Sequence, residues 1–217
     1  MKTVLAIDGL DGSGKSTFAR RLSSALVEAG ITPVLFRVDD FRQPVAWTTP
    51  ELEADQYYDA YYDLEQCETC LRAFVEGKRE VAIPIYDIPS ERVTGTRLLD
   101  LSGATVAVVE GVFPLRIPHA ASGVLIYLDA TEAEIRRRIL ARDLKKGRTA
   151  EEILRRIDRR YVPSQRRYQR ELTPRDRADI VIDNEDPSAP VTLRCDLDRV
   201  PEPLRAALDR LLKRSLV

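Results

Sequence analysis

Residues 9–17 read GLDGSGKST, and this stretch decides the fold of the chain. Gly9, Gly14, Lys15 and Ser16 stand at the spacing of a phosphate-binding loop, in which Gly is followed by four residues and then by Gly, Lys and Ser or Thr. A Gly-rich backbone approaches phosphate oxygens closely enough for several N–H groups to converge on them. In this pattern Lys15 reaches the β- and γ-phosphates, and the Ser16 hydroxyl is a ligand of Mg²⁺. The alternative is an ordinary Gly-rich turn.

The residues on either side of the loop favour the phosphate-binding interpretation. Residues 4–7, Val-Leu-Ala-Ile, form a short apolar run typical of a buried parallel strand. After the loop, apolar residues recur at helical spacing from Phe18 to Ala29, and Gly30 is a typical helix end. We therefore expect ATP (or GTP) and Mg²⁺ to be bound by Gly9, Asp11, Gly12, Ser13, Gly14, Lys15, Ser16 and Thr17.

Alternating strand and helix patterns extend over most of the chain. Strands are predicted at residues 3–7, 34–38, 81–85, 105–109, 124–128 and 179–182. Helices are predicted at residues 15–29, 52–76, 132–146, 150–172 and 203–213. This alternation indicates an α/β P-loop NTPase fold, a three-layer sandwich with a mostly parallel sheet of five or slightly more strands between helices. No linker or repeat interrupts the pattern, so we expect one domain over residues 1–217, with an Arg-rich lid at about residues 136–150.

The composition argues against several classes of partner. The 34 basic and 35 acidic residues nearly cancel, so no overall charge favours nucleic acid or an anionic membrane. The apolar run at the N-terminus is too short for a secretory signal, and no later run has the length of a membrane span, which predicts a cytoplasmic protein. Cys67, Cys70 and Cys195 form an odd set, consistent with reduced thiols, and His119 is the only His, so a four-ligand zinc site is not predicted. The sequence leaves a homo-oligomer open.

Acidic residues follow the predicted strands directly, where open parallel sheets bind their ligands. Asp39 and Asp40 end the second strand, and Asp39 is the stronger candidate for the carboxylate that accepts the acceptor's proton in phosphoryl transfer. A turn or a helix cap is the alternative role of both residues. Glu110 follows the apolar run 106–109 and is placed to bind Mg²⁺ through a water, in a metal site with Ser16 and Asp39.

The Arg-rich segment 135–148 predicts a lid over the nucleotide. Arg138 and Arg142 are four residues apart and share one helical face, and Gly147 is a candidate hinge before Arg148. An Arg-lined lid stabilises transition-state charge and excludes water that would otherwise be phosphorylated. In the alternative interpretation, the segment is a surface helix whose arginines pair with neighbouring glutamates.

Residues 56–63, QYYDAYYD, contain four of the eight Tyr residues of the chain. Aromatic faces stack on planar bases, and carboxylates accept hydrogen bonds from sugar hydroxyls, as a nucleoside pocket requires. Tyr at this density equally suits the rim of a helix that packs on the core. Both interpretations stay open at this stage.

Six motifs follow one another in an order that resembles the uridine kinase family of P-loop kinases, over about residues 3–184: GLDGSGKST, VDDF, PIYD, VVEG, IRRRILARD and RADIVIDN. The resemblance implies phosphorylation by ATP or GTP of a primary hydroxyl, in that family the 5′-hydroxyl of uridine or cytidine. It implies that Asp39 is the catalytic base and that Arg142 and Arg148 belong to the lid. Because phosphoryl transfer requires groups that stabilise developing charge, Lys15, Arg138 and Arg142 are expected as further catalytic residues. The resemblance places Asp59 and Arg138 near the sugar and Tyr86 near the base. Taken together, the residues expected at the substrate are Asp39, Phe41, Arg42, Tyr58, Asp59, Tyr86, Arg92 and Arg138.

The chain departs from these motifs in the acceptor region. Arg42 stands where the family usually has Tyr, and Glu91 stands near the usual place of a His, followed by Arg92. A related kinase with another acceptor, of the phosphoribulose, pantothenate, nicotinamide riboside or glycerate type, is therefore the second hypothesis. A nucleotide-binding module without transfer activity is the third, although no Asn-Lys-x-Asp motif of GTPases is present. Asn184, after the last predicted strand, is expected near adenine or in a simple turn.

Overall fold

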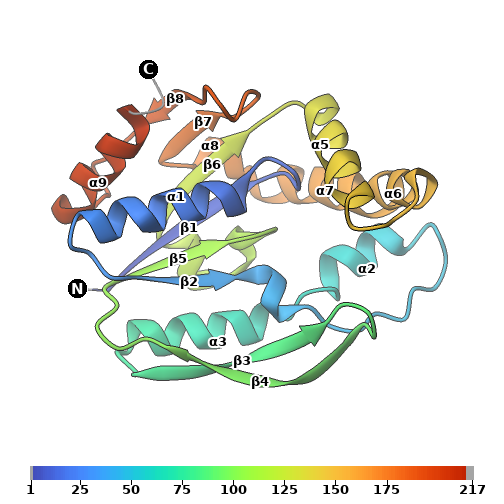
Figure 1. The fold of residues 1–217 in the computed structure, drawn as a ribbon, viewed down its shortest axis with the longest axis horizontal. Coiled ribbons are helices and arrows are strands. Elements are labelled where there is room, and N and C mark those ends of the chain that lie inside the picture. The colour runs from blue at the N-terminus through green and yellow to red at the C-terminus, as the bar shows by residue number, and fades with distance from the viewer. Residues whose placement is uncertain (1, 214–217) are drawn as a thin grey trace.

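The structure, a computed structural model, describes residues 2–213 and is built around a six-stranded sheet (Figure 1). The strand order is β2-β5-β1-β6-β7-β8, and all neighbours are parallel except β7 and β8. The strands are β1 (Thr3–Gly9), β2 (Pro33–Arg37), β5 (Val106–Glu110), β6 (Val124–Asp129), β7 (Ile180–Asp183) and β8 (Val191–Cys195). The mostly parallel sheet is thus confirmed. The edge strand β8 was not predicted, because its residues are mostly exposed and form no buried run.

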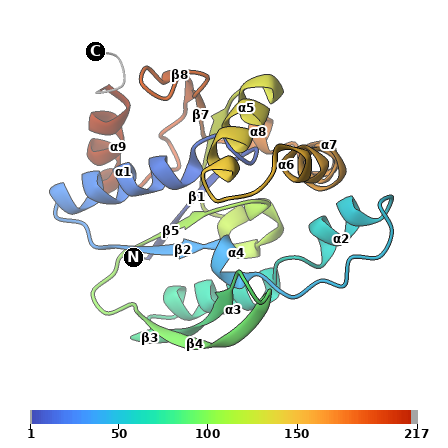
Figure 2. The same ribbon diagram turned by 45° about the vertical axis from the view of Figure 1, so that its right-hand side comes forward.

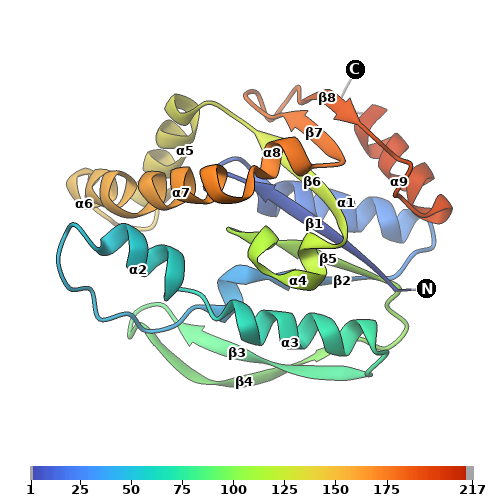
Figure 3. The same cartoon turned by 180° about the vertical axis from the view of Figure 1, so that it is seen from behind.

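Helices cover both faces of this sheet, which makes the structure three-layered (Figures 1 and 3). The first face packs on α1 (Lys15–Glu28) and α9 (Glu202–Lys213), and the second face on α3 (Leu64–Val75), α4 (Pro118–Ala121), α7 (Val162–Leu172) and α8 (Pro174–Arg177). Leu5 and Leu22 lie in the first core, Ala6 and Phe74 in the second. Because β1 is covered on both faces, consecutive residues of this strand are apolar. No helix among residues 2–213 is both long and apolar enough to cross a lipid bilayer.

A further group of helices stands beyond the carboxyl ends of the strands (Figure 2). The group consists of α2 (Glu53–Asp59), α5 (Glu132–Leu144), α6 (Ala150–Arg156) and the π-helical turn η3 (Ile157–Tyr161). Ile135, Ile139, Ile153 and Ile157 form a small core between α5, α6 and η3. The helix predicted at 132–146 is confirmed as α5, whereas the one predicted at 150–172 is interrupted by η3. Such π-helical turns inside helices often occur at functional sites.

The single helix predicted at residues 52–76 was wrong, because α2 and α3 are separate. Between them the chain turns so that Tyr62 forms an antiparallel bridge with Arg42 and the Asp63 amide donates to the Phe41 carbonyl. The Asp63 side chain then accepts a hydrogen bond from the Gln66 amide at 2.8 Å and begins α3. Contacts with a distant segment therefore override the local helical pattern.

The strand predicted at residues 81–85 exists but lies outside the central sheet. It belongs to β3 (Glu80–Asp87), which pairs with the antiparallel strand β4 (Arg92–Asp100) in a separate two-stranded sheet below α3 (Figure 1). Ile83 is buried, whereas Ile85 and Leu98 are exposed. A strand inside a parallel sheet is buried on both faces, and β3 does not meet that condition.

Candidate active site

The loop between β1 and α1 has a conformation that only glycine supports at its key positions. Gly9 and Gly14 have φ of 140° and 102°. A Cβ on Gly9 would lie 2.5 Å from the Leu128 carbonyl oxygen, and one on Gly14 would lie 2.6 Å from Nδ2 of Asn184. Lys15 is buried, and its Nζ donates to the carbonyls of Gly9 and Leu10, each at 2.8 Å. The loop backbone therefore surrounds the Lys15 ammonium group at the amino end of α1, a helix of 14 residues.

A cavity of about 480 Å³ opens over this loop at the carboxyl ends of the strands. Among the described residues, seven cationic and four acidic side chains line it: Lys15, Arg42, Arg138, Arg142, Lys146, Arg148, Arg156, Asp11, Asp39, Glu110 and Asp143. Gly12, Gly14, Ser16 and Thr17 line the same cavity. The excess of positive charge in a walled space attracts anions, so the cavity suits a triphosphate.

Oxygen ligands for a divalent cation lie beside the loop. The Ser16 hydroxyl donates to Oε2 of Glu110 at 3.0 Å, and Asp39 lines the same cavity. Glu110 is buried, and this burial, together with the nearby charge of Asp39, raises the pKa of its carboxyl. Among residues 2–213, no three His, Cys, Asp or Glu residues are arranged as a metal site. The donor set fits Mg²⁺, which typically takes few protein oxygens and completes its shell with water and phosphate.

One part of the cavity wall is rich in tyrosine, and we call it the tyrosine end: Asp39, Arg42, Tyr57, Tyr61, Tyr62, Arg156 and Tyr161. Asp39 comes from the short turn η1 (Val38–Phe41) and pairs with Nη2 of Arg42 at 2.5 Å. The Tyr62 hydroxyl donates to Oδ1 of Asp39 at 3.3 Å, and the hydroxyls of Tyr57 and Tyr62 are 3.1 Å apart. Burial raises the pKa of both phenols well above the usual range, so they remain protonated donors.

The arginines of α5 and the following loop converge on one buried carboxylate. Asp143 contacts Nε of Arg142 at 2.8 Å, Nη1 of Arg148 at 3.1 Å and Nζ of Lys146 at 3.7 Å. Nη1 of Arg142 also lies 3.2 Å from Oδ1 of Asp11 in the phosphate loop. Burial would raise the pKa of Asp11, but the charges of Arg142 and Lys15 outweigh burial and hold that pKa below its ordinary value. These ion pairs connect α5 to the phosphate loop across the cavity.

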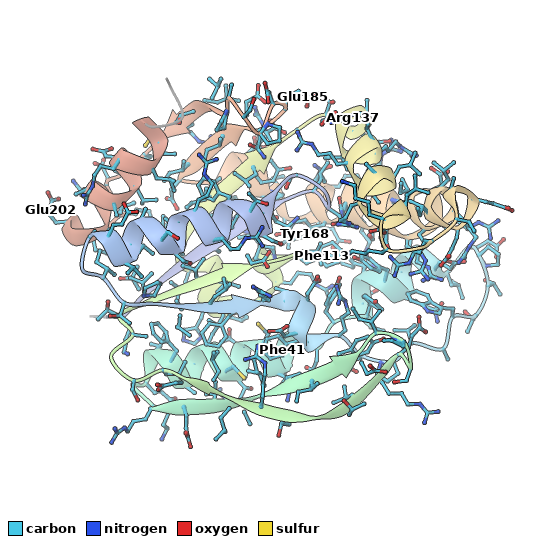
Figure 4. The ribbon with its side chains drawn as sticks, viewed as in Figure 1. Phe41, Phe113, Arg137, Tyr168, Glu185 and Glu202 are labelled. Atoms are coloured by element: carbon cyan, nitrogen blue, oxygen red, sulfur yellow. The ribbon has the colours of Figure 1, made fainter. Side chains whose placement is uncertain are left out.

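Arg138 has a different environment from Arg142. Its Nε pairs with Glu134 at 2.7 Å, and its Nη2 donates to the carbonyls of Asn184 and Glu185, both at 2.7 Å. Nδ2 of Asn184 in turn donates to the Ser13 carbonyl at 2.6 Å. Arg138 and Asn184 therefore join α5, the phosphate loop and the segment after β7, where Figure 4 labels Glu185.

The comparison with known families explains this combination of sheet, loop and acidic residues. A family model described as "Phosphoribulokinase / Uridine kinase family" matches residues 4–187. The chain belongs to this family. The resemblance and the P-loop kinase fold expected from the sequence are thereby confirmed.

Solved structures agree with the family. A possible uridine kinase from Bacillus stearothermophilus is 28% identical, covers 83% of this chain and 88% of its own, and superposes with a TM-score of 0.65. A candidate fructose transport system kinase from Silicibacter sp. TM1040 is 21% identical, covers 78% of this chain and 85% of its own, and has a TM-score of 0.64. The second likeness concerns the fold alone.

Five residues that the sequence predicts at the acceptor do not line the cavity. Tyr58 is buried between the guanidiniums of Arg116 and Arg167, 4.1 and 4.3 Å from its ring, and its hydroxyl donates to Glu171. Asp59 pairs with the same two arginines. The other three lie elsewhere: Phe41 in the core between β2 and α3 (Figure 4), and Tyr86 and Arg92 on the β3–β4 hairpin. Their assignment to the substrate stays a prediction.

Other cavity residues were not singled out from the sequence of this kinase. Tyr57, Tyr61 and Tyr62 lie in the Tyr-rich segment, but which of its tyrosines face the cavity could not be predicted, because α2 ends at Asp59 and the chain turns before Tyr62 bridges Arg42. Arg156 and Tyr161 belong to no motif, and only the fold brings α6 and η3 to the cavity. Asp40, the alternative to Asp39, does not line the cavity and pairs with Arg97 of the hairpin at 2.9 Å.

Proposed function

We propose that this family member transfers the γ-phosphoryl group of ATP to a hydroxyl of a small nucleoside-like acceptor. One observation carries the proposal: the phosphate-binding loop and Asp39 line the same cavity, so a triphosphate on the loop and a hydroxyl at Asp39 would share one space. Nucleotide binding alone would not require a carboxylate and a set of tyrosines in the same cavity as the loop.

In this proposal the phosphate-loop end holds the donor. Lys15 exchanges its contacts with the carbonyls of Gly9 and Leu10 for the β- and γ-phosphates, and the loop amides donate to the same oxygens. Ser16 would bind Mg²⁺ directly and Glu110 would bind it through a water. When bound, this ion neutralises charge on the phosphates.

Asp39 orients the acceptor hydroxyl and takes its proton. The hydroxyl oxygen then bonds to the γ-phosphorus, the bond from that phosphorus to the β,γ-bridging oxygen breaks, and ADP leaves with the electron pair. Arg142 and Arg148 line the same cavity, where they stabilise the charge that develops on the transferred group. To do so, Arg142 exchanges Asp11 for phosphate oxygens.

The tyrosine end suits the body of the acceptor. The rings of Tyr57 and Tyr61 stack with centroids 5.1 Å apart, and Tyr57 also contacts Tyr161 at 5.3 Å. Aromatic walls of this kind bind planar bases and the apolar faces of sugars. A nucleoside is therefore our first candidate, in keeping with the possible uridine kinase among the similar structures. An acidic or phosphorylated acceptor is the second candidate, and the presence of Arg42 in the cavity favours it.

A panel of hydroxyl acceptors with matched variants tests the proposal. Wild-type protein, Asp39→Asn and Asp40→Asn are incubated with MgATP and nucleosides, sugars, sugar phosphates or hydroxy acids, and products are detected by mass spectrometry. We expect Asp39→Asn to lower kcat by about 10² to 10⁴, the usual contribution of a general base. Asp40→Asn, which removes a carboxylate outside the cavity, should keep wild-type turnover. Full activity of Asp39→Asn on the same acceptor would refute the role of Asp39.

A further inference from the structure

Arg156, the last residue of α6, is a cavity residue to which the proposed transfer assigns no role. Its side chain is only 17% exposed, and its Nη2 pairs with Glu152 at 2.7 Å. Within the described part of the chain, its Nε is buried and has no hydrogen-bond partner. An unpaired buried N–H is costly. The Arg156 guanidinium is therefore fixed by Glu152, and its Nε–H can still donate a hydrogen bond.

Arg156 lies at the tyrosine end, in the wall of the same cavity as Tyr61 and the Asp39–Arg42 pair. Burial raises the pKa of the Tyr61 phenol, and the positive charges of Arg42 and Arg156 both oppose that rise. Arg42 is also well covered, with 21% of its side chain exposed. Two arginines thus stand in the walls where the body of an acceptor would lie.

Binding of an acceptor at Asp39 would change the pairing of charges at the tyrosine end. Arg42 is paired with Asp39 at 2.5 Å, and Asp39 is the carboxylate that the proposed transfer needs for the acceptor hydroxyl. Glu152, the partner of Arg156, is 36% exposed and does not line the cavity. An acceptor whose hydroxyl engages Asp39 would therefore leave Arg42 without its counter-ion in a partly desolvated wall, which a second cation, Arg156, also lines.

We propose that the acceptor carries a carboxylate or phosphate group and that Arg42 and Arg156 bind it. This inference rests on the proposed function, because it places the acceptor hydroxyl at Asp39. The planar guanidinium fork donates two parallel hydrogen bonds to either anion, which a neutral acceptor cannot accept as strongly. When the anion binds, it replaces Asp39 as the partner of Arg42, and Asp39 becomes free for the hydroxyl. Arg42 and Arg156 are thus specificity-determining residues.

Paired ligands that differ by one anionic group test this inference by calorimetry. The pairs are glycerol and glycerate, uridine and its 6-carboxylate, and ribulose and ribulose 5-phosphate. The protein is saturated with Mg²⁺ and a non-hydrolysable ATP analogue, so that the phosphate loop is occupied. The variants are Arg156→Gln and the matched control Arg159→Gln, which removes the same charge from an exposed residue that does not line the cavity.

We expect wild type and Arg159→Gln to bind the acidic member of at least one pair tenfold or more tightly than the neutral member. Arg156→Gln should lose most of this preference while its affinity for the nucleotide analogue and for the neutral member stays within about twofold. Arg156→Lys should restore part of it. The carboxylate and phosphate pairs identify which anion is recognised.

Two results would overturn the inference: equal binding of both members of every pair by wild type, or an unchanged preference in Arg156→Gln. The same ligands are then tested for phosphoryl transfer with MgATP. An acidic preference that depends on Arg156, without transfer to any ligand, would refute the proposed function and leave the anion site in place. Phosphorylation of uridine, with no preference for the acidic ligands, would support the proposed function and refute the anion site.

Discussion

At the scale of single residues, Asp8 stands out because its carboxylate is buried behind the phosphate loop. It is 1% exposed, accepts a hydrogen bond from the Tyr168 hydroxyl at 2.5 Å, and accepts another from the Gly9 amide at 2.6 Å (Figure 4 labels Tyr168). Burial raises the pKa of Asp8, and this effect outweighs the lowering by the two hydrogen bonds. The pKa is therefore about 6, compared with an ordinary value of 3.8. The folded protein therefore binds this proton more tightly than the unfolded chain does.

This shift predicts a pH dependence of stability that Asp8→Asn removes. The protonated Asp8 carboxyl stabilises the folded state below about pH 4, and this stabilisation is lost as the pH rises through 6. The reason is that the pKa of Asp8 is higher in the folded protein than in the unfolded chain. Between pH 4.5 and 7.5 the free energy of unfolding of Asp8→Asn should gain about 2 kcal/mol relative to wild type, measured by urea denaturation. The control Asp198→Asn changes an exposed carboxylate and should show no such gain. An equal offset of Asp8→Asn at both pH values would contradict the burial argument.

At the scale of elements, the wall of the tyrosine end depends on a buried ion cluster between α2 and the α6–η3 segment. Glu53 is 5% exposed and accepts from Nη1 of Arg155 at 2.9 Å and from Nε of Arg160 at 2.5 Å. The Arg160 guanidinium lies 3.6 Å from the ring centroid of Trp47, in the segment before α2. These contacts fix Tyr57 of α2 against Tyr161 of η3, both in the cavity wall.

Glu53→Gln should destabilise the protein by about 3 kcal/mol, because removing one partner of a buried ion pair leaves uncompensated charge. The free energy of unfolding in urea measures this loss. Glu51→Gln is the matched control, because it makes the same chemical change at an exposed residue two positions earlier. A loss below about 1 kcal/mol for Glu53→Gln, or an equal loss in both variants, would show that the cluster does not hold the two elements together.

The same elements show which features of the fold follow from local sequence. β1, the phosphate loop and α1 were predicted correctly because each depends on its own residues: an apolar run, glycines with positive φ and an amphipathic repeat. The break between α2 and α3 was missed because it depends on the pairing of Tyr62 with Arg42, twenty positions away. The separate β3–β4 hairpin was missed for a similar reason, since partner choice between strands is non-local.

At the scale of the whole molecule, strand order assembles the site. β5 lies between β2 and β1, so Glu110 pairs in register with Ile7 of β1 and Arg37 of β2. The segments that follow these strands carry Ser16 and Asp39, which therefore meet Glu110 at one edge of the sheet. That these acidic residues gather there was predictable from the topology of parallel sheets. That Arg156 joins them was not, because α6 reaches the cavity only through packing between α5, α6 and η3.

A structure of the protein with Mg²⁺ and a non-hydrolysable ATP analogue tests the central claim, that the phosphate loop holds the donor opposite Asp39. We predict the β- and γ-phosphates within hydrogen-bond distance of the loop amides and of Lys15, the metal ion on the Ser16 hydroxyl, and the γ-phosphate facing Asp39 across the cavity. A nucleotide bound outside this cavity, or a γ-phosphate directed away from Asp39, would contradict the account.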